Sequence, residues 1–170
     1  RGAYLVQGLT HCGACHTPRN FLGAERQNWA LTGATYQDEV QSGNFRHWSA
    51  VNLTTAQSGL GSWSLDDIIA YLKNGINRYA SVFGPMVKVI MNSTRHLTQA
   101  DVRAIATYLT SLPPKEEQTG GPRASDEVLN TGESLYTIHC GTCHLETGLG
   151  SPVILSLIHI SEPTRPRLIS

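Results

Sequence analysis

Two stretches of the chain carry apolar residues at helical spacing directly after a polar residue that favours a helix start. The first follows Ser64, which has a carboxylate three residues later as in a capping box, and Gly75 is placed to end it. The second follows Thr98 and runs to Pro113, which cannot continue a helix. The sequence predicts two amphipathic helices, whose apolar residues are Ile68, Ile69, Tyr71 and Leu72 in one and Val102, Ile105, Ala106, Leu109 and Leu112 in the other.

Two shorter helical patterns each lead into a pair of cysteines. Residues 2–9 predict a short helix before Cys12, and residues 127–139 predict another before Cys140. No alternating strand pattern surrounds either pair of cysteines. The order of predicted elements therefore indicates a mainly α fold.

A long polar stretch separates the first pair of cysteines from the first capped helix. Residues 20–62 are rich in Gly, Asn, Ser, Thr and Gln and show little periodicity. We predict a loop there, with a short hairpin around residues 29–36. Such a long irregular segment is unusual in a compact domain, unless a bound cofactor organises the packing in place of a sheet.

Composition and charge narrow the class of protein. The 170 residues suffice for one large domain or two small ones, and 40% of them are hydrophobic. The formal net charge is zero, whereas nucleic-acid binders carry a basic excess, so we expect no nucleic-acid partner. No apolar run reaches the roughly 18 residues of a membrane-spanning helix. Residues 114–125 are charged and then rich in Gly and Pro, and predict a linker between a domain at 1–113 and a second unit at 126–154.

All four cysteines fall in two copies of one motif. The copies are Cys12, Cys15 and His16, and Cys140, Cys143 and His144. This C-x-x-C-H spacing is typical of c-type haem attachment. The two thiols can form thioether bonds to the two vinyl groups of haem, and the histidine can bind the iron as its proximal ligand. The sequence predicts covalent haem c at both motifs, with His16 and His144 as iron ligands.

Two other kinds of site also use paired cysteines. Two C-x-x-C pairs can build a tetrahedral zinc site, but zinc needs no histidine after each pair, and these pairs lie 128 residues apart. A thioredoxin-like dithiol needs strands that alternate with helices, which neither motif has. Both remain alternatives to the haem interpretation, which the repeated histidine favours.

The two methionines of the chain are the candidates for the sixth iron ligand. Met86 follows a Gly-Pro turn that can hold its side chain towards the haem, whereas Met91 lies in an apolar run and is expected in the core. We predict that Met86 is the ligand. Beside His16, we expect the Pro18 carbonyl to accept a hydrogen bond from the imidazole Nδ1. Arg19 is expected either on a haem propionate or in solvent.

The predicted order of helix, haem motif, long loop, helix, methionine turn and terminal helix resembles class I cytochrome c. The resemblance narrows to the multihaem cytochrome c subunit of bacterial membrane-bound alcohol, aldehyde and gluconate dehydrogenases. It covers residues 1 to about 145 and rests on the blocks R-G-A-Y-L-V-Q-G-L-T-H-C-G-A-C-H-T-P-R, N-L-T, G-L-G-S-W-S-L-D-D-I, F-G-P-M and L-T-Q-A-D-V-R-A-I-A-T-Y-L-T-S-L-P-P. By this resemblance Cys12 and Cys15 attach haem, and His16 and Met86 are its axial ligands. The implied fold is a class I cytochrome c domain followed by a truncated second cytochrome c domain.

The helix before each motif carries a glycine and an aromatic residue. In a cytochrome c first helix, the glycine lies eight residues and the aromatic residue four residues before the first cysteine, and the glycine permits a close crossing with the last helix. Gly132 and Tyr136 hold these offsets before the second motif. Before the first motif, Tyr4 and Gly8 hold them in reverse order. The two units are expected to be related but not identical.

No motif for substrate chemistry is present. The sequence offers no nucleophile with a paired base, no phosphate loop, and no flavin or nicotinamide fingerprint. We therefore expect electron transfer. The resemblance implies a quinoprotein or flavoprotein catalytic subunit as partner, membrane quinone as electron acceptor, and the periplasmic face of the bacterial cytoplasmic membrane as location. A stand-alone soluble dihaem electron carrier is the alternative.

Both ends of the chain lead us to expect a fragment. The chain opens on Arg1 with no signal peptide, although covalent haem attachment implies export from the cytoplasm. After His144 no methionine and no capped helix follow, so the second haem has no predicted sixth ligand. Residues 155–170 resemble a translated sequencing adapter, and we exclude them, His159 included, from functional inference.

Overall fold

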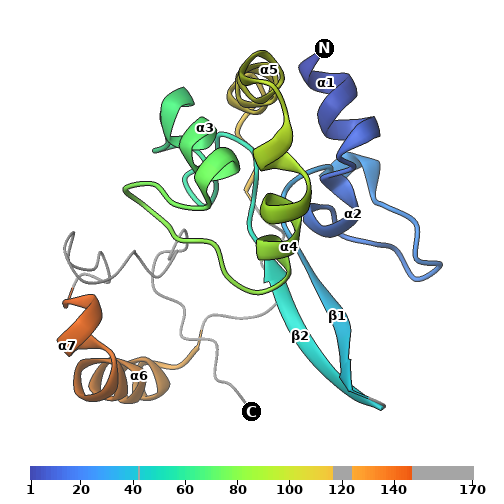
Figure 1. The fold of residues 1–170 in the computed structure, drawn as a ribbon. Coiled ribbons are helices and arrows are strands. Elements are labelled where there is room, and N and C mark those ends of the chain that lie inside the picture. Colours follow the sequence, from blue (N-terminus) through green and yellow to red (C-terminus); the bar gives the residue numbers. More distant parts are fainter. Residues whose placement is uncertain (42, 117–123, 147–170) are drawn as a thin grey trace.

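The computed structural model describes residues 1–41, 43–116 and 124–146, and helices dominate this part of the chain (Figure 1). None of the helices in these ranges is long and apolar enough to cross a bilayer. In chain order the elements are α1 (Gly2–Tyr4), the π-helix η1 (Leu5–Leu9), α2 (Gly13–His16), the 3₁₀ helix η2 (Gln27–Trp29), β1 (Ala34–Gln41), β2 (Asn44–Ala50), α3 (Leu65–Asn74), α4 (Pro85–Asn92), the 3₁₀ helix η3 (Thr94–His96), α5 (Gln99–Thr110), α6 (Asp126–His139) and α7 (Gly141–His144).

The two capped amphipathic helices, α3 and α5, are confirmed. The Ser64 hydroxyl accepts a hydrogen bond from the Asp67 N–H, and the Asp67 carboxylate accepts one from the Ser64 N–H, so the capping box is complete. Gly75 ends α3 in the left-handed conformation with φ of 76°. The Thr98 hydroxyl caps α5 by accepting a hydrogen bond from the Asp101 N–H at 3.1 Å. The caps at the starts of α3 and α5 are hydrogen bonds between residues three positions apart. Because these partners are close in the sequence, the sequence alone locates the helix starts.

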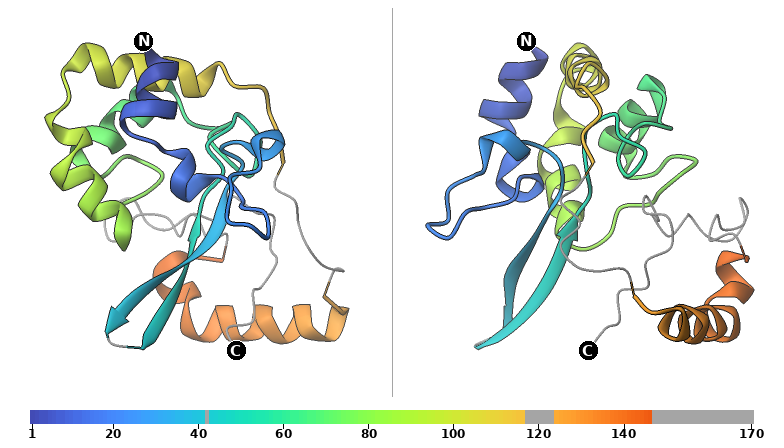
Figure 2. Two further views of the ribbon diagram at one scale, coloured as in Figure 1. Left: turned by 90° about the vertical axis from the view of Figure 1, so that its right-hand side faces the viewer. Right: turned by 180° about the vertical axis from the view of Figure 1, so that it is seen from behind.

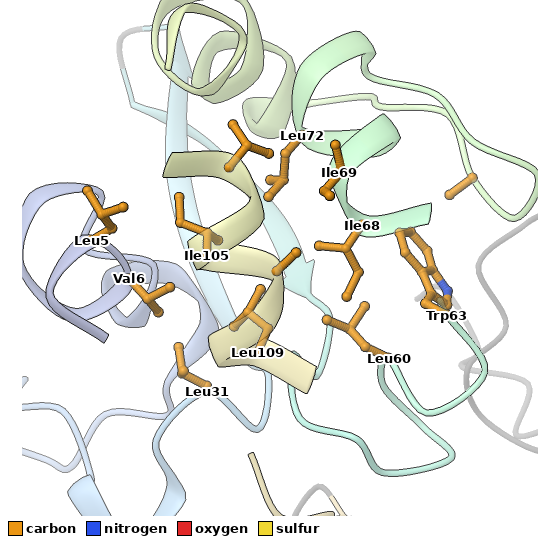
Figure 3. Packing of buried hydrophobic residues seen from close by; sticks show 13 residues of the cluster. Leu5, Val6, Leu31, Leu60, Trp63, Ile68, Ile69, Leu72, Ile105 and Leu109 are labelled. Atoms are coloured by element: carbon orange, nitrogen blue, oxygen red, sulfur yellow. The ribbon is translucent and has the colours of Figure 1, made fainter. Parts of the chain in front are cut away.

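Helix α5 lies at the centre of the hydrophobic core (Figure 3). Figure 3 shows Ile105 and Leu109 of α5 between Leu5 and Val6 on one side and the α3 side chains on the other. The loop before α3 adds Leu60 and Trp63, and Trp63 stacks on Tyr79 with ring centroids 5.7 Å apart. The core thus joins η1, α3, α5 and part of the long loop. Its buried hydrophobic members are Leu5, Val6, Leu31, Leu60, Trp63, Ile68, Ile69, Leu72, Ala80, Val102, Ile105, Ala106 and Leu109.

The first helix crosses α5 at Gly2 rather than at Gly8. A Cβ atom at Gly2 would lie 2.7 Å from the Tyr108 Cβ and would also meet the Ala104 carbonyl, whereas one at Gly8 would meet only the Tyr4 ring at 3.7 Å. Between the two glycines the helix widens into the π-helix η1, in which the Thr10 N–H bonds to the Leu5 carbonyl. The widened turn changes the helical phase ahead of the first motif.

The region predicted as a loop with a short hairpin near residues 29–36 contains a longer hairpin instead. Strands β1 and β2 pair antiparallel from Ala34 opposite Ala50 to Gln41 opposite Asn44, with an irregularity between Glu39 and Gln41. Both views of Figure 2 show this hairpin extending away from α1, α3 and α5. A two-stranded sheet is marginally stable by itself in water, so its base must be supported by the rest of the domain.

The helix predicted over 127–139 is confirmed as α6, Asp126–His139. The Ser125 hydroxyl caps it at the Val128 N–H. No residue of α6 is buried among the described parts of the chain, and α7, which holds the second motif, packs on it. Residues 117–123, most of the predicted linker, lie outside the described residues, as do 147–154 of the second unit, the tail at 155–170 and His159 within it.

The crossing at Gly2 gives a test with an internal control. Replacing Gly2 with Ala is expected to destabilise the domain by about 1–3 kcal/mol, because the added methyl group meets backbone atoms of α5 that cannot move aside cheaply. Replacing Gly8 with Ala meets no close neighbour and is expected to be neutral or stabilising by up to about 1 kcal/mol. Urea denaturation of both variants measures the difference. Equal midpoints would place the crossing elsewhere.

Candidate functional site

One helical turn presents the first C-x-x-C-H motif. Helix α2 spans Gly13–His16, and the His16 N–H bonds to the Cys12 carbonyl at 3.0 Å. The turn therefore holds both thiols and the imidazole on one short rigid element. None of the four cysteines forms a disulfide bond, so no thiol is consumed by a cross-link.

A backbone carbonyl 35 residues along the chain orients the His16 ring. The imidazole Nδ1–H donates to the Val51 carbonyl at 2.7 Å. Burial of the ring lowers its pKa, which favours the neutral imidazole. With Nδ1 protonated and bonded, Nε2 carries the lone pair that binds a metal. The prediction that Pro18 supplies this acceptor is wrong, because the Pro18 carbonyl accepts the Arg26 N–H at 2.8 Å.

The base of the hairpin lies against the motif. Burial raises the pKa of the Cys12 thiol, and the hydrogen bond with the Thr10 hydroxyl, 3.3 Å from the sulfur, opposes this shift. The raised pKa keeps the thiol protonated near neutrality. The pKa of Tyr36 on β1 is raised by burial and then by its neighbour Cys15. The strand β1 thus reaches the second thiol of the motif, and the motif supports the hairpin in return.

The same hairpin contacts the methionine turn. Trp48 on β2 lies directly opposite Tyr36 in the strand register. Its ring presses on Gly84, where a Cβ would be 2.5 Å from the Trp48 Cζ3, and lies 6.5 Å from the Phe83 ring. Gly84 has φ of 59° and ψ of −146°, a conformation that favours glycine, and it directly precedes the Pro85 that begins α4. The hairpin therefore connects the motif to the turn that carries Met86.

Three features of this region fit a haem. The Trp48 Nε1–H is buried without a hydrogen-bond partner among the described residues, and a propionate oxygen is an acceptor that would satisfy it. Phe83 and Val87 flank Met86 and remain 71% and 36% exposed, an apolar surface suited to a porphyrin. Met86 itself is partly buried and packs on the same core as Cys12. The donor set, the apolar surface and the unsatisfied donor agree with the group that the motif predicts.

One side chain near this region, Met91, differs from its expected position, whereas Arg19 is exposed, which is one of the two positions expected for it. Met91, expected in the core, is 47% exposed, and its sulfur lies 3.2 Å from an Arg95 guanidinium nitrogen. Only one side of α4 contacts the core, and Ile90 is its buried residue. Arg19 donates to the Gly23 carbonyl at 2.6 Å and to the Ala14 carbonyl at 3.1 Å. Its guanidinium therefore holds the loop after the motif.

The second motif has the same local form without the same support. Helix α7 spans Gly141–His144, and the His144 N–H bonds to the Cys140 carbonyl at 2.9 Å. The His144 Nδ1 is buried and has no partner among the described residues, which continue only to residue 146. Across the described ranges, no three His, Cys, Asp or Glu side chains gather into a metal-binding group, so the two motifs do not converge there as a shared zinc site requires.

Tyr36, Trp48 and the Val51 carbonyl are parts of the site that sequence reasoning missed. The signal that the sequence offered for the hairpin was Gly43, which turns the chain with φ of 80°. The flanking residues do not alternate regularly, since Phe45 and Trp48 lie three residues apart and therefore on opposite faces of β2. No sequence signal marks the Val51 carbonyl, because any residue offers a backbone acceptor and only the fold chooses which one His16 meets.

A one-turn C-x-x-C-H helix with an oriented histidine is the local arrangement that attachment of c-type haem requires. Known proteins narrow the identification, although no protein-family model matches the chain. The chain is 40% identical over 174 residues to the fructose dehydrogenase cytochrome subunit of Gluconobacter japonicus. It is 36% identical over 188 residues to the gluconate 2-dehydrogenase cytochrome c subunit of Pantoea cypripedii. It is 37% identical over 166 residues to the cytochrome c subunit of a quinone alcohol dehydrogenase from Gluconobacter oxydans.

These alignments cover 89%, 94% and 88% of this chain, respectively. The chain spans only 34%, 42% and 33% of the lengths of the three relatives. The resemblance predicted from the sequence blocks is confirmed: homologues at 36–40% identity over most of the chain are cytochrome c subunits of fructose, gluconate and alcohol dehydrogenases.

The contact between Trp48 and Gly84 can be tested by comparing two glycines. Gly84 and Gly23 both have positive φ, 59° and 81°, but only Gly84 has a neighbour that an added Cβ would strike. Gly84→Ala is expected to cost about 1–3 kcal/mol more than Gly23→Ala, because the added methyl group meets the Trp48 ring at a backbone conformation, φ of 59° and ψ of −146°, that residues with a Cβ rarely adopt. Thermal or urea unfolding gives the two values. A Gly84→Ala cost no larger than that of Gly23→Ala would mean that the Trp48 ring does not pack there.

Proposed function

We propose that the chain transfers electrons through covalently bound haem c. The observation that carries the proposal is the His16 imidazole, held by the Val51 carbonyl with Nε2 left to bind iron, in one helical turn with the two free thiols. The haem iron supplies one-electron chemistry, alternating between ferrous and ferric states. The protein supplies attachment, axial ligands and an apolar environment that sets the potential.

Each residue of the first site has a defined part in binding. The Cys12 and Cys15 thiols would each add across one vinyl group of haem, with the thiol proton passing to the vinyl carbon, so that attachment needs no oxidant. His16 Nε2 and the Met86 sulfur would bind the iron. The buried Trp48 Nε1–H would donate to a propionate oxygen.

The domain organisation follows the two motifs. We assign residues 1–113 to a class I cytochrome c domain, 114–125 to a linker, and 126–154 to the start of a second cytochrome c domain, with 155–170 as a non-native tail. In the second unit Cys140 and Cys143 attach haem and His144 binds its iron. The matching one-turn geometry of α2 and α7 supports the assignment.

The homologues suggest the electron donor and acceptor. Fructose, gluconate and alcohol dehydrogenases are the complexes to which the related subunits belong, so the donor is a catalytic dehydrogenase subunit with a quinone-type or flavin cofactor. Two one-electron transfers for each substrate molecule oxidised would reduce one membrane quinone, with two protons, to its quinol. The location that we propose for the chain is therefore the periplasmic face of the cytoplasmic membrane, where such a reaction would occur.

The first experiment is absorption spectroscopy of the protein produced with c-type haem maturation. We expect sharp reduced α and Soret bands that persist after denaturation and extraction, since thioether bonds survive both. Double Cys→Ser variants of each motif should each lose the haem of that motif only. A colourless protein that carries zinc would refute the proposal. Co-purification with a large catalytic subunit distinguishes a dehydrogenase subunit from a stand-alone dihaem carrier.

The two methionines provide a matched test of the sixth ligand. Met86→Ala is expected to leave haem attached, to lower the midpoint potential of the first haem, and to let an exogenous ligand such as imidazole bind, because methionine sulfur raises the potential and fills the sixth position. Met91→Ala, in the same helix but 47% exposed, should change neither property. A redox titration of both variants decides the matter. An unchanged potential in Met86→Ala would remove Met86 from the ligand set.

A further inference from the structure

The chain does not leave the first domain where α5 ends. Helix α5 finishes at Thr110, yet the next residues remain hydrogen-bonded to the loop after β2. The Thr55 hydroxyl donates to the Leu112 carbonyl at 2.7 Å, and the Gln57 N–H donates to the Glu116 carboxylate at 3.3 Å. The segment that follows the double proline is therefore attached to the domain along its length up to residue 116.

Asn52 is the buried centre of this attachment. Its side chain is 0% exposed. The amide nitrogen donates to the Lys115 carbonyl at 2.8 Å and to the Ser58 hydroxyl at 3.1 Å, and the amide oxygen accepts the Thr54 N–H at 2.8 Å. A buried amide with every contact satisfied holds its partners in one geometry, because any displacement leaves polar groups unpaired.

Thr54 and Lys115 complete the attachment. The Thr54 hydroxyl accepts the Lys115 N–H at 3.2 Å and lies 3.2 Å from the Lys115 carbonyl oxygen and 2.8 Å from the Asn52 amide oxygen. The Lys115 ammonium lies 4.5 Å from the centroid of the Trp29 ring and donates to the Asn28 carbonyl. Lys115 lies outside any helix, yet its N–H, its carbonyl and its side chain all have partners.

The attachment adjoins the support of the haem ligand. Val51, whose carbonyl receives the His16 Nδ1–H, directly precedes Asn52. One short segment of loop therefore holds the axial histidine with one residue and the departing chain with the next. Helix α5 itself is held by apolar packing of Val102, Ile105, Ala106 and Leu109, so these polar contacts act on the segment beyond the helix.

We propose that Asn52 and Thr54 form a clamp on Lys115 that fixes where the chain leaves the first haem site on its way to the second motif at Cys140. The inference rests on the proposed function of the two motifs. Because Lys115 is held through its main-chain N–H and carbonyl, the chain leaves the first site at Lys115 and not at the end of α5. A fixed exit point limits the positions that the second motif can take relative to the first site. Asn52 and Thr54 are thus positioning residues for electron transfer between the two haems.

Trypsin cleavage after Lys115 measures the clamp directly. Thr54→Val keeps the shape of the side chain and removes the hydroxyl that holds Lys115. Cleavage at this bond is expected to become roughly tenfold faster, because the lost buried hydrogen bonds raise the population of the released segment. Thr94→Val is the matched control: Thr94 is 4% exposed against 3% for Thr54, and its hydroxyl bonds to the Leu72 carbonyl, away from the clamp. Thr54→Ser should restore protection. Equal cleavage rates in the two Val variants would overturn the clamp.

Flash-induced electron transfer between the haems measures its consequence. In the haem-loaded protein one electron passes from the ferrous iron of one site to the ferric iron of the other. Thr54→Val should slow this step by about twofold or more, because the exit point of the chain is no longer fixed, with the potential and spectrum of the first haem unchanged. Lys115→Met keeps the main-chain groups that Asn52 and Thr54 hold and loses only the contacts of the ammonium with Trp29 and Asn28, so its rate should change less than that of Thr54→Val. An unchanged rate in Thr54→Val overturns the positioning role.

The two experiments separate failure of this inference from failure of the proposed function. The cleavage assay needs no haem, and it reports on the clamp even if neither motif binds one. Absence of haem at both motifs would refute the proposed function, whereas bound haems with an unchanged inter-haem rate would refute only the inference.

Discussion

The hydrogen bond from the His16 imidazole to the Val51 carbonyl is the contact on which the rest of the site depends. It joins a motif near the start of the chain to the segment that follows the hairpin. Without it, the ring has no fixed orientation and no defined nitrogen for a metal. Because Val51 is held by the hairpin on one side and by Asn52 on the other, the whole loop becomes the support of one side chain.

This constraint gives the long polar region a function. The hairpin connects Cys15, through Tyr36 and Trp48, to the glycine turn before Met86. The following loop contributes Leu60 and Trp63 to the core and the polar residues that hold Lys115. A region with little periodicity thus organises both sides of the site.

The helices were predictable because their signals are local. Ser64, Gly75 and Thr98 satisfy helix ends within a few residues, and the apolar stripes follow the 3.6-residue period. The failures share one cause. The crossing glycine, the acceptor for His16 and the exposure of Met91 each depend on a partner distant in the sequence or on a change of helical phase. The π-helix at Leu5–Leu9 moved the crossing to Gly2, and no offset rule includes such an insertion.

The sequence by itself determined the chemistry: two C-x-x-C-H motifs, one methionine turn, and the resemblance to dehydrogenase cytochrome subunits that homologues confirm. Residue types at fixed short spacing carry that information, because one helical turn already places both thiols and the imidazole. Only the tertiary structure decided what orients His16, what packs on Gly84, and where the chain leaves the domain. Those contacts use backbone carbonyls, aromatic faces and buried amides, and their partners become neighbours only when the chain has folded.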